Sequence, residues 1–546
     1  MSVWIGIDLG TQSVRALAVA ADGRVLGSAS RPLTSHRDGP RHEQDPEEWW
    51  RELAAATRLA LRDVPAAWIE GVAVAATSGT VLLTDPSGRP LTPALMYDDR
   101  RADASLANEA GAHVWERLGY RRMQPNWALP KLLWLLRDAP ADARLAHQSD
   151  FVNRRLVGRA VATDLSNALK TGVDLVEERW PEEVFDALGV SAGVLPEVVR
   201  PGALLGTVCA TAAEETGIPA GTPVIAGTTD GCAAQLGAGA TRPGSWNSVL
   251  GTTLVLKGVT KELIHDPLGV VYSHRAPDGS WLPGGASSTG AGVLSRDLPD
   301  RDLDALAAEA MARYGPPPGR TPDALTPHPG NRTPDGLPAR PGNRTPDGPT
   351  PHPGNLTPGS LTPGNLTPRP NSRAWRQGRP SGAASARRMP PAVSYPLVSR
   401  GERFPFAAPD AESFTLGEPA DDVERYVAIL LGAAFVERLC FDYLDLLGAP
   451  VDGEIILTGG ATRSAYWTQL RADVLERPVT LRENAEPALG MAVLAGGDPA
   501  RMIRTRAVVR PSGADLREPY LRFVAELERR GWLDATAAAH ARERTA

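Results

Sequence analysis

The stretch VWIGIDLGTQSVRALAVAADGRVL, residues 3 to 26, predicts the core of the fold. Val3 to Ile7 is a compact apolar run that suits a buried strand, and Val14 to Ala20 is a second one. The polar residues 8 to 13 between these runs form a tight turn, and Asp22-Gly23 offers another. We therefore expect a β-hairpin that continues into a third strand.

The turn after the first strand carries residues suited to phosphate chemistry. Asp8 follows a buried strand, where its carboxylate could hold a hydrated Mg²⁺. The Gly10-Thr11-Gln12 turn lets backbone N–H groups approach phosphate oxygens closely. An ordinary hairpin, in which Asp8 and Gly10 are only turn residues, is the alternative. This stretch alone does not decide the function.

Composition and charge exclude several classes of partner. The chain has 546 residues, 42% hydrophobic and 22% charged, which leaves room for two sizeable domains. A net charge of −6 gives no reason to expect nucleic acid as a partner. The three cysteines are too far apart for a disulfide framework or a CxxC metal site. Because no long apolar run or signal peptide is visible, we expect a cytoplasmic protein that does not enter a membrane.

A second aspartate repeats the arrangement around Asp8. Residues 223 to 226 form a short apolar run that ends in Gly227-Thr228-Thr229-Asp230-Gly231 and leads into a helix of small residues. Two such aspartates suit phosphoryl transfer from Mg-ATP, because one can order the metal while the other accepts the proton of an attacking hydroxyl. We count Asp8 and Asp230 as metal-binding candidates. The alternative for Asp230 is a helix N-cap and nothing more.

Two further glycine turns are candidates for nucleotide contacts. Gly251-Thr252-Thr253 lies between two predicted strands, and this repetition of the first hairpin indicates a duplicated domain. Gly459-Gly460 lies between a predicted strand and a helix, where glycine lets a base or a phosphate approach the backbone. Tight packing of that helix on its strand is the alternative for Gly459-Gly460.

Polar residues between positions 77 and 101 are candidates for contacts with a polyol. Thr77-Ser78-Gly79-Thr80 interrupts an apolar strand pair, so Ser78 could face a sugar, with a β-bulge as the alternative. Asp99 and Arg101 follow the second of these strands and are either ligand groups or a surface salt bridge.

The composition changes completely between residues 314 and 394. PGNRTPDG and PGNLTP each occur twice there, and such a proline-rich tract cannot bury enough apolar surface to become ordered. We expect a disordered insertion in the second domain. From residue 501 onward the pattern predicts a charged helical tail.

Taken together, these stretches resemble the FGGY family of carbohydrate kinases. The motifs that carry the resemblance, in their order along the chain, are IGIDLGTQSVRA, EQDPEEWW, PKLLWLLRD, SDFVNRRLVGRAVATDLSNALKTGVD, AGTTDGCAAQLGAG, SVLGTT, GGASSTGAG, LTGGATRSAYWTQLRADVL and EPALGMAVLAG. The resemblance implies an α/β fold of two actin-like, ribonuclease-H-like ATPase domains with a central cleft. The implied ranges are 1–242 for the sugar-side domain, 243–313 with 395–500 for the nucleotide-side domain, 314–394 for the insertion and 501–546 for the tail.

The resemblance also implies roles for the candidate residues. Asp230 matches the catalytic base of the family, and Asp8 matches the aspartate that helps to place metal and phosphate. Gly10-Thr11-Gln12 and Gly251-Thr252-Thr253 match its phosphate loops, and Gly459-Gly460 matches the glycines beside the adenosine. ATP and Mg²⁺ are the implied cofactors. On the sugar side we expect contacts from Asp8, Ser78 and Asp230, with Thr11 and either Asp99 or Arg101 as further candidates.

The substrate is predicted from finer similarities. TSGTVLL, DLSNALKTG, GVVYSH and YPLVSRGERFP are similar to the D-ribulose kinase branch, which is also called xylulose-kinase-like. The chain departs from common patterns at Tyr97, where a Trp is usual, and at Thr77-Ser78-Gly79, which replaces the QMHG loop of xylulokinases. We predict a kinase that converts D-ribulose to D-ribulose 5-phosphate. D-xylulose or another polyol is the alternative substrate, and a non-kinase ATPase of the same fold is a second alternative. A homodimer is compatible with the sequence.

Overall fold

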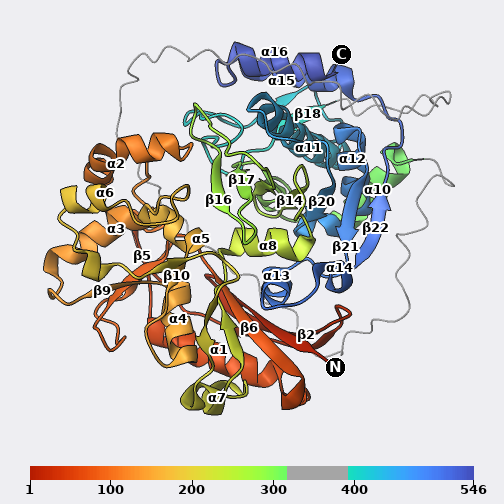
Figure 1. Cartoon of the computed structure of the whole chain (residues 1–546). Coiled ribbons are helices and arrows are strands. Elements are labelled where there is room, and N and C mark those ends of the chain that lie inside the picture. Colours follow the sequence, from red (N-terminus) through yellow and green to blue (C-terminus); the bar gives the residue numbers. More distant parts are fainter. Residues whose placement is uncertain (317–391, 546) are drawn as a thin grey trace.

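The computed structural model describes residues 1–316 and 392–545, and two large mixed sheets organise it (Figure 1). The first sheet, in spatial order, consists of β12 (Leu204–Thr207), β13 (Pro223–Ile225), β6 (Ile69–Ala76), β1 (Val3–Leu9), β2 (Ser13–Ala20) and β3 (Val25–Pro32). The second consists of β16 (Tyr272–Arg275), β17 (Trp281–Ala286), β15 (Leu254–Gly258), β14 (Trp246–Leu250), β20 (Ile455–Thr458), β21 (Val479–Arg482) and β22 (Thr505–Val509).

The two sheets share one topology. β3, β2 and β1 are antiparallel neighbours, and β6 and β13 continue the sheet parallel to β1. In the same way β17, β15 and β14 are antiparallel, and β20 and β21 continue parallel to β14. This repeat confirms the predicted α/β fold with two similar domains. The boundaries of those domains stay proposals.

Helices cover both faces of these sheets. Those of the first half are α1 (Pro46–Ala60), α2 (Ser105–Arg117), α3 (Ala128–Leu135), α4 (Gln148–Val157), α5 (Leu165–Ala168), α6 (Glu182–Ala187), α7 (Ala210–Thr216) and α8 (Asp230–Ala238). Those of the second half are α9 (Gly292–Asp297), α10 (Leu303–Tyr314), α11 (Asp422–Leu446), α12 (Ala465–Leu475), α13 (Pro487–Leu494), α14 (Pro499–Met502), α15 (Arg517–Arg529) and α16 (Ala535–Thr545). Figure 1 shows α8 and α13 between the two halves, where they pack on each other.

The alternation of side chains along β1 determines where Asp8 points. The odd-numbered residues from Val3 to Leu9 are fully buried in the core that also contains Trp49 of α1. The even-numbered residues therefore face the opposite side of the sheet, toward α13. A Cβ on Gly6 would lie 1.7 Å from the carbonyl oxygen of Ala488, so glycine allows α13 to pack directly on the strand. Asp8 consequently points toward the space between the two halves.

The core of the second half contains a buried ion pair. The guanidinium of Arg471, on α12, lies 2.7 Å from the carboxylate of Glu437, on α11, and neither side chain is exposed. Glu437 also accepts a hydrogen bond from the Ser248 hydroxyl of β14 at 2.6 Å. This cluster therefore ties two helices to the strand that precedes Gly251.

The first half carries a third sheet that the sequence did not predict. Its strands, in spatial order, are β4 (His36–Asp38), β5 (Arg41–Gln44), β8 (Ala94–Leu95), β7 (Val81–Thr84) and β9 (Arg144–His147). Two short pairs complete the sheets, β10 (Thr163–Asp164) with β11 (Val198–Val199) and β18 (Val393–Tyr395) with β19 (Phe414–Leu416). Because β6 and β7 belong to different sheets, they are not the strand pair that we expected.

One predicted segment needs correction. The prediction of a helical tail over 501–546 is wrong at β22, whose alternating exposed and buried residues pair with β21 as an edge strand. The expected disordered insertion, 314–394, lies outside the described residues except at its ends, where Tyr314 ends α10 and Val393 begins β18.

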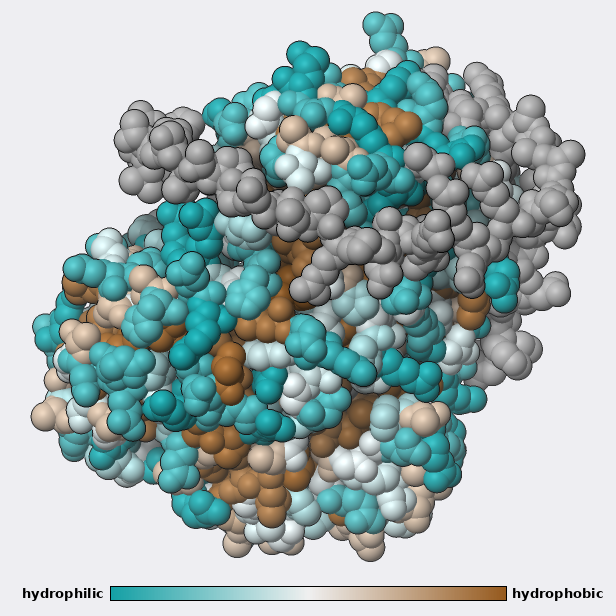
Figure 2. Space-filling view, turned by 45° about the horizontal axis from the view of Figure 1, so that its top comes forward, coloured by the Kyte–Doolittle hydropathy of each residue, from teal (hydrophilic) through white to brown (hydrophobic). Residues whose placement is uncertain are grey.

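The exposed apolar residues of the surface come from several helices and strands and not from a single one. The face in Figure 2 is largely hydrophilic, with separate hydrophobic areas. Exposed Leu59, Leu106 and Leu204 come from α1, α2 and β12, and such scattered exposure is common on protein surfaces. Across the described ranges, no helix is both long and apolar enough to cross a membrane.

Candidate active site

The structure brings Asp8 and Asp230 to one edge of the first sheet. β1, β6 and β13 are parallel, so their carboxyl ends meet at this edge. Asp8 is paired with Ala75 of β6, and a bridge between Ala76 and Thr229 places Asp230 just beyond the same edge. With β6 between them, the two backbones are about 10 Å apart. The two carboxylates therefore converge on the space between the halves.

Asp230 is the first residue of α8 and its side chain does not cap the helix. Thr229 is the N-cap residue, so the alternative of a simple N-cap is wrong. The Asp230 carboxylate accepts a hydrogen bond from the Gly231 N–H at 2.7 Å. Burial raises the pKa of Asp230, while that hydrogen bond and the charges of Lys170 and Lys257 oppose the rise. A buried carboxylate with a raised pKa beside two lysines is suited to act as a general base.

Asp8 lies in β1 itself, so it is not the turn residue of the alternative interpretation. One of its carboxylate oxygens, Oδ1, is buried without a hydrogen-bond partner among the described residues. Burial and the charge of Asp230 raise the pKa of Asp8 to about 7, and Arg15 opposes this shift. Arg15 itself pairs with Glu486, which precedes α13. Asp8 thus has one carboxylate oxygen without a hydrogen bond, and it lies close to the carboxylate of Asp230.

These carboxylates fit a hydrated Mg²⁺. The unpartnered Oδ1 of Asp8 offers the oxygen ligand that this cation prefers, and a cation would offset the repulsion between Asp8 and Asp230. Within 1–316 and 392–545, no cluster of three or more His, Cys, Asp and Glu residues could hold a metal. A site with so few protein ligands matches the way Mg²⁺ is bound through one or two carboxylates together with substrate phosphates.

The raised pKa of Asp8 predicts proton release on metal binding. At pH 7 about half of the Asp8 side chains carry a proton, which the cation must displace. We expect Mg-ATP to release about half a proton more from the wild type than from Asp8→Asn at pH 7, and to bind more tightly at pH 8 than at pH 6. Calorimetry in buffers of different ionisation enthalpy measures this release. Equal proton release from both proteins would exclude Asp8 as a ligand.

Both predicted phosphate loops are tight turns between antiparallel strands. The Gly10 N–H donates to the carbonyl oxygen of Ser13 at 3.1 Å, and the Gly251 N–H donates to that of Thr253 at 3.1 Å. The second loop is also fixed from behind, because the Gly292 N–H at the start of α9 donates to the carbonyl oxygen of Thr252 at 3.1 Å. The loops thus have matching geometry on the two sheets, as a duplicated fold requires.

The remaining residues of the first loop lie beside α1. The carbonyl oxygen of Thr11 accepts a hydrogen bond from the Gln44 side chain at 2.6 Å. Gln44 in turn accepts from the indole N–H of Trp49 at 2.7 Å. The side chain of Gln12 is exposed. The loop is therefore fixed through Thr11, while Gln12 faces outward.

Gly459 and Gly460 differ in their surroundings. Gly459 has a positive φ of 84°, and a Cβ there would lie 2.5 Å from the carbonyl oxygen of Leu250, so packing on β14 requires glycine. Gly460 is exposed, and a Cβ there would meet only the end of the Arg463 side chain at 3.4 Å. The alternative of tight packing thus applies to Gly459, whereas Gly460 presents open backbone.

The loop with Ser78 connects β6 of one sheet to β7 of another, so it is not a β-bulge. Thr77 is hydrogen-bonded to Gln148, which fixes the loop. The Ser78 hydroxyl is buried without a partner among the described residues, and its carbonyl oxygen accepts from the Lys170 ammonium at 3.1 Å. Ser78 therefore offers a free hydroxyl close to Lys170.

Asp99 and Arg101 bind each other rather than a ligand. The Arg101 guanidinium lies 2.7 Å from Asp99 and 2.6 Å from Glu43. Asp99 is fully buried, so the alternative of a surface salt bridge is wrong in its location. Tyr97, two residues earlier, is 39% exposed, and burial together with the charges of Asp98 and Asp230 raises the pKa of its phenol. The loop therefore places Tyr97 near the site, and the ion pair between Arg101 and Asp99 stabilises the loop.

The structure adds residues that the sequence reasoning missed. Lys170 and Lys257 flank Asp230, and His274 is close to both lysines. His274 is buried, its Nδ1 is 3.0 Å from the Ser166 hydroxyl, and burial and the two lysines hold its pKa well below the ordinary value. One feature of the sequence could have drawn attention to these lysines. Lysine is scarce, with only four lysines among the 58 lysine and arginine residues.

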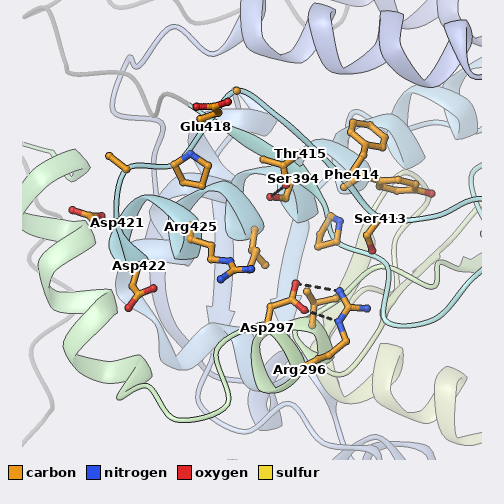
Figure 3. A pocket seen from close by; sticks show the side chains of 17 residues that line it. Arg296, Asp297, Ser394, Ser413, Phe414, Thr415, Glu418, Asp421, Asp422 and Arg425 are labelled. Atoms are coloured by element: carbon orange, nitrogen blue, oxygen red, sulfur yellow. Dashed lines mark hydrogen bonds and ion pairs between the residues drawn. The ribbon is translucent and has the colours of Figure 1, made fainter.

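A cavity of about 580 Å³ opens elsewhere in the second half (Figure 3). Its walls are formed by the last turn of α9, β18, β19 and the first turns of α11. Arg296 and Asp297 form an ion pair on one wall, and Arg425 faces them. None of the predicted site residues lines this cavity. It is therefore distinct from the edge that carries Asp8 and Asp230.

Comparison with protein families covers most of the described chain. Residues 3–237 match the N-terminal domain of the FGGY family of carbohydrate kinases. Residues 377–497 match the C-terminal domain of the same family. The first match ends before the proline-rich tract and the second begins within its last part, and together they include Asp8, Asp230 and Gly459-Gly460.

Individual proteins agree with this match. Xylulose kinase from Streptomyces coelicolor is 34% identical over 51% of this chain and 59% of its own length. Apulose kinase from Pectobacterium atrosepticum is 31% identical over 46% of this chain and 53% of its own length. The chain thus aligns with only about half of each curated relative. A solved "xyloylose kinase" from Brucella ovis superposes with a TM-score of 0.73 at 23% identity, covering 97% of this chain and 99% of that one, which shows a common fold.

Proposed function

The chain belongs to the FGGY family of carbohydrate kinases, and we propose that it transfers the γ-phosphoryl group of ATP to the terminal hydroxyl of a ketopentose. The observation that carries this proposal is the convergence of buried Asp230 and Asp8 on one sheet edge. Family membership favours a sugar kinase over a non-kinase ATPase of the same fold.

The proposed mechanism uses Asp230 as the general base. Its carboxylate would accept the proton of the sugar hydroxyl as the oxygen attacks the γ-phosphorus in line. Asp8 would hold Mg²⁺, which when bound neutralises charge on the phosphate oxygens. Gly10-Thr11-Gln12 and Gly251-Thr252-Thr253 would bind the phosphates from the two sheets, with Gly460 beside the adenosine. Closure of the two halves would exclude water and so limit ATP hydrolysis.

The sugar would lie against the first half. The Ser78 hydroxyl, which has no partner among the described residues, provides one donor and one acceptor for the sugar hydroxyls. The Lys170 ammonium donates one hydrogen bond to the Ser78 carbonyl oxygen and has two further donors for the sugar. Tyr97 lies on the neighbouring loop, where its partly exposed ring can cover an apolar face of the sugar. Asp99 and Arg101 are paired with each other, and we assign them a supporting role in this loop.

D-Ribulose is our first choice of substrate, and D-xylulose is the second. The Ser78 loop, which differs from the QMHG loop of xylulokinases, supports D-ribulose. The relatives named xylulose kinase support D-xylulose. We further propose that the enzyme acts in the cytoplasm on small molecules alone.

A substrate panel tests these proposals. ADP release from Mg-ATP is followed with D-ribulose, D-xylulose, L-ribulose, ribitol and glycerol, and with no sugar. We expect D-ribulose to give the highest kcat/KM and the blank to be near zero. A higher kcat/KM for D-xylulose would reverse the order of the two substrates. Equal ADP release with and without every sugar would overturn the kinase assignment.

A further inference from the structure

Lys257 is the buried lysine of this chain that lacks a partner. Of the four lysines, Lys261 is exposed, while Lys131 and Lys170 are buried and donate to backbone carbonyl oxygens. Lys257 is only 7% exposed, and within the described ranges its ammonium makes no hydrogen bond or ion pair. The carboxylate of Asp230 interacts with this ammonium electrostatically but makes no hydrogen bond to it, so the hydrogen-bond donors of the Lys257 ammonium remain available to an anion.

The fold points Lys257 toward the site. Leu254 and Leu256 of β15 are fully buried in the core of the second half, so Val255 and Lys257 project from the opposite face of the strand. That face packs against α8, whose first residue is Asp230. Lys257 thus approaches Asp230 from the second half, a few residues after the loop that ends at Thr253.

Two glycines make room for the Lys257 side chain. A Cβ on Gly231 would lie 3.7 Å from Cε of Lys257, and a Cβ on Gly284 would lie 3.5 Å from the same atom. Gly231 follows Asp230 directly, and Gly284 is the β17 residue paired with Lys257. The aliphatic stem is therefore confined between the two halves, and the ammonium beyond Cε is held beside Asp230.

The charges near Lys257 come from both halves of the molecule. Lys170 and Lys257 both act on the carboxylate of Asp230, and Asp230 in turn acts on Asp8. The pKa of His274, which also lies near the two lysines, is held well below its ordinary value by burial and by both lysines. A Mg²⁺ held by Asp8 would offset the charge of that carboxylate, so the two ammonium groups would then face the single carboxylate of Asp230. This arrangement suits a group that carries several negative oxygens.

We propose that Lys257 binds the phosphoryl group while it passes from ATP to the sugar, an inference that rests on the proposed kinase function. In this step the bond between the γ-phosphorus and its bridging oxygen breaks and a bond to the sugar oxygen forms. ADP leaves with the electron pair, and the hydroxyl proton goes to Asp230. The Lys257 ammonium stabilises the negative charge on the transferred oxygens.

Replacement of Lys257 tests this role through kinetics. We expect Lys257→Met to lower kcat about a hundredfold and to change the KM for the sugar less than about threefold, since the contact belongs to the transition state. Lys257→Arg should restore part of the rate, because it keeps the charge. Lys261→Met, a change on the exposed turn after β15, should match the wild type. A Lys257→Met kcat within about threefold of the wild type would overturn the inference, whereas a wild type without sugar-dependent turnover would overturn the proposed function itself.

A binding measurement separates this role from a structural one. Aluminium fluoride with Mg-ADP and sugar mimics the planar phosphoryl group in transfer. We expect fluoride to tighten ADP binding at least tenfold in the wild type and less than about twofold in Lys257→Met, while both proteins bind Mg-ADP alone with similar affinity. If Lys257→Met keeps the full fluoride effect, Lys257 does not contact the phosphoryl group. If Mg-ADP binding itself is lost, Lys257 holds the structure of the site and the inference is equally wrong.

Discussion

Asp230→Asn should reduce kcat by about two to four orders of magnitude, the usual share of a general base. Asparagine has nearly the same shape and can still accept the hydrogen bond from the Gly231 N–H, so the start of α8 should remain intact. It cannot take the proton of the sugar hydroxyl. Coupled ADP release at saturating Mg-ATP and sugar measures the effect, and the affinity for Mg-ADP should be kept because both lysines remain.

The matched control for Asp230→Asn is Asp22→Asn. Asp22 lies in the turn before β3, at the opposite end of β2 from the Gly10-Thr11-Gln12 loop, and forms an exposed ion pair with Arg24. Its replacement should leave kcat unchanged within about twofold. If Asp230→Asn also keeps near-normal turnover, another group accepts the proton and the assignment of Asp230 is wrong.

Glu437→Gln should lower the free energy of unfolding by about 3–5 kcal/mol, although it lies away from the site. Both charges of the Glu437–Arg471 pair are fully buried. Glutamine keeps the volume but leaves the Arg471 guanidinium uncompensated in the core, which costs more than the loss of one hydrogen bond. Guanidinium unfolding followed by tryptophan fluorescence measures this change.

Two further variants show whether charge is the cause. Glu518→Gln removes one member of the exposed pair with Arg522, and it should cost less than about 0.5 kcal/mol. The double variant Glu437→Met/Arg471→Met removes both buried charges and should recover most of the stability lost by Glu437→Gln. If Glu437→Gln is no less stable than Glu518→Gln, the buried pair does not stabilise the second half.

Local sequence patterns predicted much of the fold because the signals lie within short windows. The apolar runs on either side of residues 8–13 indicate the first hairpin, and the alternation along the first strand fixes the direction of Asp8. The same logic located Asp230 after β13. The exposed edge strand β22 was missed, because the arginines in and around it resemble those of a solvated helix and only pairing with β21 makes it a strand.

Contacts between residues that are far apart in the sequence could not be predicted from local patterns. Lys257 approaches Asp230 from the other half of the chain, so no spacing in the sequence indicates their proximity. Arg101 was predicted as either a ligand group or part of a surface salt bridge, but the loop that carries it folds onto Glu43 of the third sheet. Gly459 was proposed as a nucleotide contact, and the structure shows that its backbone packs on Leu250 of another strand. Each of these facts depends on tertiary contacts.

The most direct test of the central claim follows the fate of the γ-phosphate by phosphorus NMR. With Mg-ATP and D-ribulose, we predict that a sugar phosphomonoester signal grows in step with ADP, and that Asp230→Asn forms it at least a hundred times more slowly. A reaction without sugar should leave ATP almost unchanged. Inorganic phosphate that accumulates at the same rate with and without sugar would contradict the account, because water and not a sugar hydroxyl would then be the acceptor.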